Sequence, residues 1–476
     1  MHDLMRLDAV EQARLIREGT VSALEMVDAS IKAIEQWNPV LNAVVTPLFE
    51  RAREEASRVR ARRGAPFSGV PFLLKDFLAE YAGTRLTEGS RFLHDHVSST
   101  DSELVARYRH AGFIIVGKTN TPEFASKPTT EPELFGPTGN PWNPAFSASG
   151  SSGGSASAVA AGMAALAHAN DGGGSIRCPA AWCGLVGLKP TRGRNPLGPG
   201  YGDMGAGLVC EHVVTRSVRD TAAVLDCTAG ADAGAPYSPS APKRPFAAEV
   251  GLAPGRLRLA FSTIPVAPAE VHPECRAAVI EAARRCEALG HHVEEAVPSV
   301  DASRFTEIFT TLWLGMVAWT IRDWARRLGR EPRAEDFEAH TWKMFSLDAK
   351  RKPSDFLLAV QDMQRMAREI APFFDRYDAW LTPTTTQPPQ PNGWFDFDPV
   401  HPGQAAQRMG DVTKFTAVAN LTGQPAISLP LHWTADNLPV GVQIIGRYGD
   451  EATLLRLASQ LESAHPWQHR WPPLVS

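Results

Sequence analysis

The sequence predicts an α/β fold, because short apolar runs of strand character alternate with amphipathic helical segments along most of the chain. A helix between two apolar strands favours parallel pairing of those strands within a layered structure. The alternation occurs in both halves of the chain, and neither a clear linker nor an internal repeat divides them. We therefore expect a single domain over residues 1–476, although this length also permits a two-domain arrangement.

Composition and charge exclude several classes of protein. The 48 basic and 52 acidic side chains give a net charge of −4, which argues against a broad nucleic-acid-binding surface. Apolar residues make up 43% of the chain and charged residues 21%, so the chain as a whole is not disordered. The 38 glycines and 38 prolines indicate many loops around a packed body.

No membrane, export or metal-binding segment is evident in the sequence. The first ten residues lack the apolar core of a signal peptide, and the apolar stretch 156–169 is too short to span a bilayer. The six cysteines are scattered without CxxC spacing, so a zinc site is not expected. These features predict a reduced, cytoplasmic protein without a metal or an organic cofactor.

Residues 1–64 are predicted to form a helical layer. Residues 7–36 have the pattern of two amphipathic helices separated by a turn at Gly19, and Ser22 is a suitable N-cap for the second of them. The helical pattern is repeated over residues 47–60.

The pattern changes to strands in the segment 65–230, which is expected to form the core. Residues 69–76 are a short apolar run that suits a buried strand, and residues 113–116 are a second one after a helix at 102–111. An alanine-rich helix is predicted over 155–167, because this stretch is apolar on nearly all sides and hence buried.

The same order of elements returns further along the chain. Strands are predicted at 183–190, 256–261 and 292–296, with a helix at 274–289 before the last of them. Residues 303–374 are predicted to form a helical insertion rich in aromatic residues. The sequence does not say whether this insertion acts as a lid.

Two matches to known motifs fail on physical grounds. Residues 112–119 fit the phosphate-loop pattern G-x-x-x-x-G-K-[ST], but the stiff apolar run inside it favours a buried strand over a compact loop. Residues 150–154 fit G-x-S-x-G, a nucleophile elbow centred on Ser152. An elbow needs a strand directly before the serine, whereas residues 140–144 are expected to form a loop that cannot join a ladder. Nucleotide binding at 112–119 and a nucleophilic Ser152 are therefore disfavoured hypotheses.

Two Gly/Ser clusters, at 149–154 and 172–175, carry the strongest functional signal. They bracket the predicted buried helix, and Asp171 and Arg177 flank the second cluster where other charges are few. Flexible turns in a buried place would leave backbone groups without partners. These glycines are therefore expected to direct their N–H groups at a ligand.

These clusters and the segments around them resemble the signature of the amidase signature family. Asn170-Asp171 and Arg192-Gly193-Arg194 are most similar to its 6-aminohexanoate-cyclic-dimer hydrolase branch. The resemblance implies the amidase-signature fold, a central mixed β-sheet covered by helices on both faces. It covers most of the chain, and the matching segments occur in the family's order: 69–76, 117–120, 136–142, 150–155, 171–177, 183–191, 381–384, 420–426 and 439–443.

The resemblance implies a catalytic site with Ser175 as nucleophile, Ser151 as a bridging serine held by a cis peptide bond, and Lys75 as base. The chemistry suits these residue types, because a serine hydroxyl needs a base to take its proton. Lysine can act as that base only when neutral, and burial at the end of an apolar strand would lower its pKa from about 10.4. Ser149 and Asn170 depart from the family's pattern, in which glycine and threonine are commoner, and both lie beside the reacting groups.

The backbone N–H groups of the second Gly/Ser cluster would form the oxyanion hole, with Gly172, Gly173 and Gly174 among its members. Side chains at these positions would block the approach of a substrate carbonyl, which explains the glycines. Asp171 and Arg177 are expected to brace the loop rather than to touch substrate.

The implied function is hydrolysis of a non-peptide carboxamide C–N bond through a serine acyl-enzyme. Helical spacing aligns four residues of the insertion as a candidate apolar wall for the substrate, although such a stripe is equally compatible with core packing. A wall of this kind would favour a sizeable apolar or oligoamide substrate. The four residues are Leu312, Trp313, Met316 and Trp319.

Two alternative functions remain open at this point. One is the catalytic subunit of a tRNA-dependent glutamine amidotransferase, and the other is a carbamate or ester hydrolase of the same family. The expected partner is a small-molecule amide rather than nucleic acid or a membrane, and a homodimer is compatible with these features.

Overall fold

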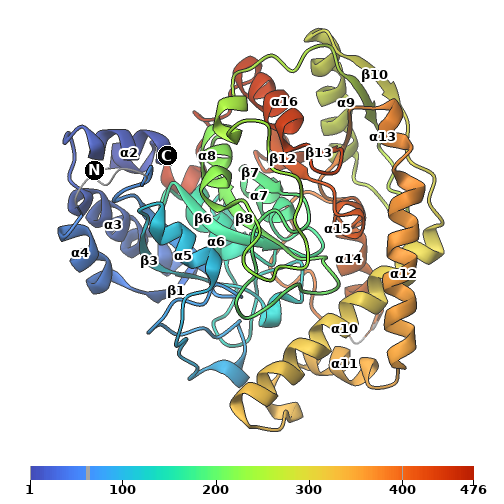
Figure 1. Cartoon of the computed structure of the whole chain (residues 1–476), viewed down its shortest axis with the longest axis horizontal. Helices are drawn as coiled ribbons and strands as arrows, with labels where there is room; N and C mark the ends of the chain where they lie inside the picture. The colour runs from blue at the N-terminus through green and yellow to red at the C-terminus, as the bar shows by residue number, and fades with distance from the viewer. Residues whose placement is uncertain (1, 60–64, 399, 402) are drawn as a thin grey trace.

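Eleven strands form one mixed β-sheet through the centre of the molecule (Figure 1). The computed structural model describes residues 2–59, 65–398, 400–401 and 403–476. The sheet has the order β1-β3-β2-β6-β8-β7-β12-β13-β11-β9-β10, and β4 pairs with β5 in a separate small sheet. The strands are β1 (Val44–Pro47), β2 (Pro71–Lys75), β3 (Ile114–Thr119), β4 (Gly139–Asn140), β5 (Asn143–Ser147), β6 (Leu166–Asp171), β7 (Val186–Lys189), β8 (Cys210–Thr215), β9 (Arg258–Phe261), β10 (His292–Glu295), β11 (Ala379–Pro383), β12 (Ala426–Trp433) and β13 (Pro439–Gly446).

Helices pack on both faces of this sheet. Two neighbouring residues of β13, Ile444 and Ile445, show this. Successive side chains of a strand point to opposite faces. Ile444 belongs to a core cluster that it shares with Leu457, whereas Ile445 belongs to another cluster that it shares with Met363. The helices are α1 (His2–Met5), α2 (Ala9–Arg17), α3 (Ala23–Leu41), α4 (Phe49–Ser57), α5 (Glu103–His110), α6 (Gly153–Ala160), α7 (Arg177–Cys183), α8 (Val218–Thr228), α9 (Pro273–Ala288), α10 (Ala302–Leu328), α11 (Ala339–Asp348), α12 (Pro353–Ile370), α13 (Phe373–Arg376), α14 (Gln404–Val412), α15 (Ala417–Thr422) and α16 (Glu451–Ala464), with short 3₁₀ helices at Arg91–Leu93, Glu123–Ala125, Phe246–Glu249, Ala334–Asp336 and Pro473–Val475.

Helix α3 begins where the sequence predicts. Ser22 is the N-cap of α3, since its hydroxyl accepts the Glu25 N–H at 3.1 Å and the Glu25 carboxylate accepts the Ser22 N–H at 2.8 Å. The third predicted helix is α4, but it follows a strand that the sequence did not reveal. That strand, β1, pairs antiparallel with β3 at the edge of the sheet.

The predicted strands at 69–76 and 113–116 are β2 and β3, which pair in parallel with α5 between them in sequence. The phosphate-loop match at 112–119 is therefore a buried strand, as expected. Its lysine, Lys118, is buried and forms an ion pair with Asp76 at 3.4 Å. The parallel pairing places the carboxyl ends of β2 and β3 at the same edge of the sheet.

Two expectations about the segment before the second Gly/Ser cluster are wrong. The alanine-rich helix does not extend to 167: α6 ends at Ala160, Gly162 has a positive φ of 70°, and residues 166–171 form β6 between β2 and β8. Alanine is compatible with a helix or a strand. The hydrogen bonds to β2 and β8 therefore determine that residues 166–171 form a strand. Residues 140–144 do join a ladder, because β4 and β5 pair there across a tight turn.

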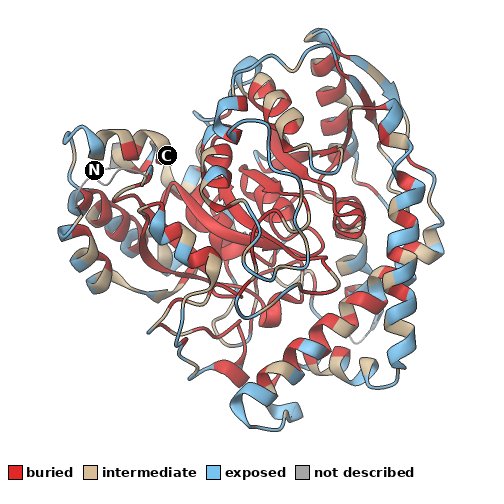
Figure 2. Ribbon diagram, viewed as in Figure 1, coloured by how far each residue is buried: buried red, intermediate tan, exposed pale blue. Residues whose placement is uncertain are grey.

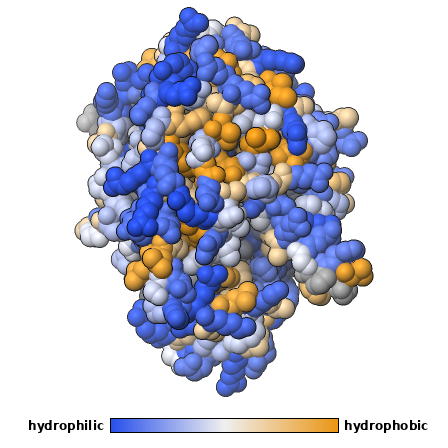
Figure 3. Space-filling view, turned by 90° about the vertical axis from the view of Figure 1, so that its right-hand side faces the viewer, coloured by the Kyte–Doolittle hydropathy of each residue, from blue (hydrophilic) through white to orange (hydrophobic). Residues whose placement is uncertain are grey.

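The predicted helical insertion consists mainly of α10, α11 and α12, at the lower right of Figure 1. Figure 2 shows α6 and the central strands buried throughout, whereas the outer face of α12 is exposed. The side of the molecule that carries α12 is mostly hydrophilic with apolar patches (Figure 3). Within the described ranges, no helix is both long and apolar enough to cross a membrane.

Candidate active site

Neighbouring strands bring the predicted base and the second Gly/Ser cluster together. Strand β2 ends at Lys75, and β6 ends at Asp171 directly before the glycines. The two strands are parallel neighbours, with Leu73 opposite Ala167, so both ends lie at one edge of the sheet. Helix α6 follows Ser151 and connects it to β6. The first Gly/Ser cluster therefore lies at the same edge of the sheet, where Ser151 contacts Lys75. The peptide bond before Ser151 is cis, as the resemblance implies.

The ammonium group of Lys75 lies in a buried polar cluster. Its Nζ atom is 2.7 Å from Oγ of Ser151, 3.0 Å from Oγ of Ser152 and 2.6 Å from Oδ1 of Asn170. The side chain has no exposed surface, and burial lowers the pKa of Lys75 to about 7. A substantial fraction of this lysine is therefore neutral at physiological pH.

Hydrogen-bond directions assign the lone pair of the neutral amine. Asn170 Oδ1 can only accept, so it takes one N–H of Lys75. The Ser152 hydroxyl donates to the carbonyl oxygen of Asn170 at 3.3 Å, so its oxygen accepts the second N–H of Lys75. A neutral amine has two N–H bonds and one lone pair, and the lone pair is left facing the hydroxyl of Ser151.

The second Gly/Ser cluster presents unpaired backbone N–H groups. Within the described chain, none of the amides of residues 172–175 donates a hydrogen bond to a protein acceptor. Gly174 has a φ of +141°, a conformation that favours glycine, and a Cβ there would clash with Thr416 Oγ1. A Cβ on Gly173 would approach Phe309 to 2.9 Å, and one on Gly172 would approach Trp313 to 3.3 Å. The loop thus needs glycine at Gly174 and leaves the amides of residues 172–175 without a protein acceptor.

A buried ion pair fixes the two ends of this loop. Arg177 donates from Nε to Asp171 Oδ2 and from a terminal nitrogen to Oδ1, both at 2.8 Å, and neither side chain is exposed. The same guanidinium also donates to the Thr416 carbonyl at 2.8 Å, to Gln443 Oε1 at 2.5 Å and to Asn420 Oδ1 at 2.7 Å. Neither Asp171 nor Arg177 lines the cavity described next, so their contacts are those of braces.

A small apolar cavity of about 220 Å³ opens beside Ser175 and Gly173. The Ser175 side chain is 8% exposed, and no hydrogen bond joins its hydroxyl to another described residue. The walls come mainly from α10, α11 and α14. They include Phe309, Trp313, Leu314, Met344 and Met409, with Lys127 and His340 as the ionisable members.

Neither ionisable wall residue offers a free charge to this cavity. Lys127 is paired with Glu338 at 2.5 Å. Burial and the neighbouring lysines Lys127 and Lys343 lower the pKa of His340 to about 4, so its imidazole is neutral near pH 7. The cavity therefore suits an uncharged, largely apolar group.

Of the four residues aligned by helical spacing, Trp313 lines this cavity. Leu312 is buried in the core cluster shared with α12, and Met316 packs against Gly205. Trp319 is 40% exposed and contacts Tyr201 on another side of α10. Since α10 is apolar on several sides, periodicity alone did not identify which side faces the cavity. Phe309 was missed for the same reason.

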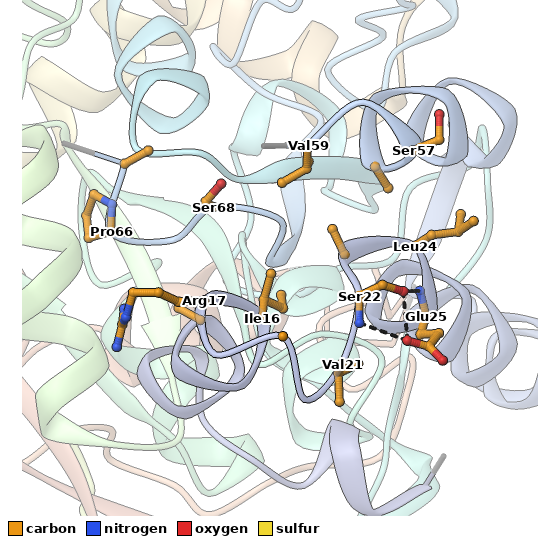
Figure 4. Close-up of a pocket in the computed structure, with 15 residues that line it drawn as sticks. Ile16, Arg17, Val21, Ser22, Leu24, Glu25, Ser57, Val59, Pro66 and Ser68 are labelled. Carbon is orange, nitrogen blue, oxygen red and sulfur yellow. Dashed lines mark hydrogen bonds between the residues drawn. The ribbon is translucent and has the colours of Figure 1, made fainter. Parts of the chain in front are cut away.

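Ser152, the centre of the elbow match, is fully buried against Lys75 and Asn170 and is not part of the cavity wall. A larger hollow of about 560 Å³ lies between α2, α3 and α4 (Figure 4). Its carboxylate, Glu25, is already used by the N-cap of α3, and no residue of the serine–lysine cluster lines it. In the described chain, no group of three or more histidine, cysteine or acidic side chains has the arrangement of a metal site.

Comparisons with known proteins show similarity to one family over nearly the whole chain. A model of the family described as Amidase matches residues 25–455. The 6-aminohexanoate-cyclic-dimer hydrolase of Paenarthrobacter ureafaciens is 38% identical over 481 residues, covering 98% of this chain and 97% of that relative. A solved structure of 6-aminohexanoate cyclic dimer hydrolase complexed with substrate matches with a TM-score of 0.95, covering 99% of this chain and 100% of that one, also at 38% identity. A bacterial aryl acylamidase of the amidase signature family matches with a TM-score of 0.87 at 28% identity, covering 97% and 96% of the two chains.

Proposed function

Because the chain belongs to the Amidase family and is a hydrolase of carbon–nitrogen bonds in amides, we propose that Ser175 attacks the carbonyl of a non-peptide carboxamide and forms an acyl-enzyme. The amidase-signature fold predicted from the sequence is confirmed by the structural matches. The observation that carries the proposal is the 2.7 Å contact between Nζ of the buried Lys75 and Oγ of Ser151.

The proposed first step moves two protons and forms one bond. Neutral Lys75 takes the hydroxyl proton of Ser151, while Ser151 takes the hydroxyl proton of Ser175. The Ser175 oxygen bonds to the substrate carbonyl carbon, and negative charge develops on the carbonyl oxygen. Burial supports this role of Lys75, because it favours the neutral amine over the ammonium.

The amides of the Gly172–Ser175 loop are proposed to stabilise that oxyanion, at about 3–4 kcal/mol for a key donor. When the tetrahedral intermediate collapses, the C–N bond breaks and the amine leaves with a proton from Ser151, which regains one from the Lys75 ammonium. Water then enters and repeats the transfer in the same order, releasing the acid and restoring Ser175. Asp171 and Arg177 hold the loop and take no part in proton transfer.

We propose that the acyl part of the substrate is uncharged and largely apolar. The cavity beside Ser175 is lined by aromatic and methionine side chains, and its one ammonium is paired with Glu338. At about 220 Å³ it is smaller than the roughly 300–1,000 Å³ of most ligand pockets. It can therefore hold one arm of a sizeable apolar amide or oligoamide, as the names of the cyclic-dimer hydrolase and aryl acylamidase relatives would suggest.

Labelling with a serine-directed fluorophosphonate, read by intact mass and peptide mapping, tests the nucleophile. We expect one label on Ser175 in the wild type and none in Ser175→Ala. Label on Ser152, lost in Ser152→Ala, would overturn the assignment and support the elbow alternative.

Turnover of paired substrates tests the substrate class. A hexanoyl or benzoyl anilide should be hydrolysed with a kcat/KM at least about 100-fold above that of acetamide, because burying an extra apolar group of several carbons adds a few kcal/mol of binding. Equal values for the two substrates would contradict the proposed apolar acyl site.

A further inference from the structure

A buried carboxylate lies directly beside the amide that contacts Lys75. In the antiparallel pairing of β6 with β8, Glu211 is the residue opposite Asn170. Asn170 donates from Nδ2 to Glu211 Oε1 at 3.4 Å and to the Phe77 carbonyl at 3.4 Å. Both of these acceptors need an N–H donor, so the amide nitrogen of Asn170 faces them. The amide oxygen Oδ1 therefore faces Lys75, whose Nζ lies 2.6 Å away.

Glu211 has a second partner, His168, whose ring nitrogen Nε2 contacts Oε2. The other ring nitrogen, Nδ1, accepts the backbone N–H of Lys75 at 3.3 Å and therefore carries no proton. With Nδ1 as acceptor, Nε2 is the ring nitrogen that donates to Glu211. With donors on both oxygens, Glu211 is satisfied as a carboxylate.

The charge of Glu211 is not neutralised by its immediate surroundings. Among the described residues, no lysine or arginine forms an ion pair with it, and its side chain is 3% exposed. The other acidic groups that act on Lys75 are Asp171 on β6 and Glu88 in the loop after β2. Asp171 is paired with Arg177, and burial raises the pKa of Glu88 to about 8 and so favours its uncharged form.

One more carboxylate near Lys75 also has a partner. Asp76, the next residue along the chain, pairs with Lys118 on β3. Lys75 itself is therefore the cation best placed to balance Glu211, through the amide of Asn170. This balance is greatest when Lys75 carries the proton that it takes from the serines.

We propose that Glu211 is a positioning residue for Lys75: through Asn170 it directs the lysine lone pair at Ser151, and its charge stabilises the ammonium that forms during the reaction. The inference rests on the proposed role of Lys75 as base. It assigns a function to a side chain that never reaches the cavity, and to the residue pair Asn170–Glu211 rather than to either residue alone.

The test is the dependence of kcat/KM on pH, from 5 to 10, with an apolar anilide as substrate. This profile reports the free enzyme's pKa values. Glu211→Gln keeps the size of the side chain and removes its charge, so Lys75 loses its proton more easily and the acid limb should move about one pH unit lower. The plateau of kcat should fall at least tenfold, because the ammonium is less stabilised.

Two further variants separate charge from structure. Glu211→Asp keeps the charge but withdraws it from Asn170, so the acid limb should stay within about 0.3 units of the wild type while kcat falls. Asn170→Asp places a carboxylate on Lys75 and should move the limb upward, opposite to Glu211→Gln. It also provides a direct test if Glu211→Gln does not fold.

Glu462→Gln is the control, because Glu462 on α16 is a partly buried carboxylate that accepts a backbone N–H, that of Val218 at 3.1 Å. Its acid limb should equal that of the wild type. If the acid limb of the kcat/KM profile in Glu211→Gln or in Asn170→Asp lies at the same pH as in the wild type, the positioning role is overturned while Lys75 stays the proposed base. A wild-type profile without any acid limb would overturn the lysine base itself, and the two failures are thereby distinguished.

Discussion

Replacing Arg177 with methionine should destabilise the fold by about 3–5 kcal/mol, because it leaves Asp171 as a buried charge without its partner. Methionine fills much of the same volume but donates no hydrogen bond. The variant therefore removes the two side-chain N–H donations of Arg177 to the carboxylate. It also leaves the side-chain oxygens of Asn420 and Gln443 without a donor, whereas the Thr416 carbonyl keeps the N–H of Ala419 at 3.2 Å.

The pKa of Asp171 gives an independent estimate of the ion-pair part. Burial by itself raises that pKa, but the charge and hydrogen bonds of Arg177, with help from Asn420 and Lys189, lower it to about 2 from an ordinary 3.8. At 1.36 kcal/mol per unit, this shift corresponds to about 2 kcal/mol of stability near neutral pH. The acceptors left without donors account for the remainder. For 476 residues the unfolding entropy is about 1 kcal/mol/K, so the melting temperature should fall by about 3–5 °C.

The sign of the pH dependence provides a second readout. Because the folded-state pKa of Asp171 lies below the unfolded value, the wild type has this stability in full above about pH 4 and loses it as the pH falls through about 2. In Arg177→Met the buried carboxylate keeps the N–H groups of Asn420 and Ile176 but loses its counter-charge, which raises its pKa. The deficit of the variant should therefore shrink as the pH is lowered from 8 to 5.

Thermal unfolding followed by tryptophan fluorescence at pH 5, 6.5 and 8 measures both effects. Arg53→Met is the control, because Arg53 pairs with Asp28 at the surface, where the two side chains are 38% and 43% exposed. Such a pair contributes about 0–1 kcal/mol, so this variant should melt within about 1 °C of the wild type. A similarly small change in Arg177→Met, or a deficit that does not depend on pH, would refute the reasoning.

Two further predictions concern the cavity and its loop. Gly174→Ala should lower kcat at least about 100-fold, because the positive φ and the clash with Thr416 Oγ1 displace the loop amides; steady-state kinetics with circular dichroism as a folding check would measure this, and kcat within threefold of the wild type would contradict it. Trp313→Ala should raise KM for an apolar anilide about tenfold by removing a wall of the cavity. Trp319→Ala is its control, because that side chain lies away from the cavity, and equal KM values for the two variants would remove Trp313 from the substrate site.

The proposed catalytic residues could be named from sequence through the family resemblance, because they lie in short, ordered motifs. Lys75 ends an apolar strand, and both serines lie in Gly/Ser clusters joined by one helix and one strand. Strand β6 was not predicted, and the predicted helix ran into its first two residues, since an alanine run has no period of two and its conformation depends on the strands beside it. This error did not affect the site, because either element returns the chain to the same edge of the sheet.

The walls of the cavity could not be predicted in the same way. Helix α10 buries residues on several sides, among them Leu312 against the core and Met316 against the loop that contains Gly205. An apolar stripe shows which side of a helix is buried only when the opposite side is polar. Here only the packing of α10 against the glycine loop distinguishes Phe309 and Trp313 from their neighbours.

Asn170 illustrates a contact that no local pattern encodes. It departs from the threonine that is commoner in the family, and on sequence grounds it raises only a question about geometry. The register of β6 with β8 answers it, since Glu211 lies opposite, 41 residues further along the chain. A threonine hydroxyl has one proton and could not donate to both Glu211 and the Phe77 carbonyl while its oxygen accepts from Lys75. The asparagine amide does all three, which supports the proposal that Asn170 and Glu211 together direct the lone pair of the proposed base.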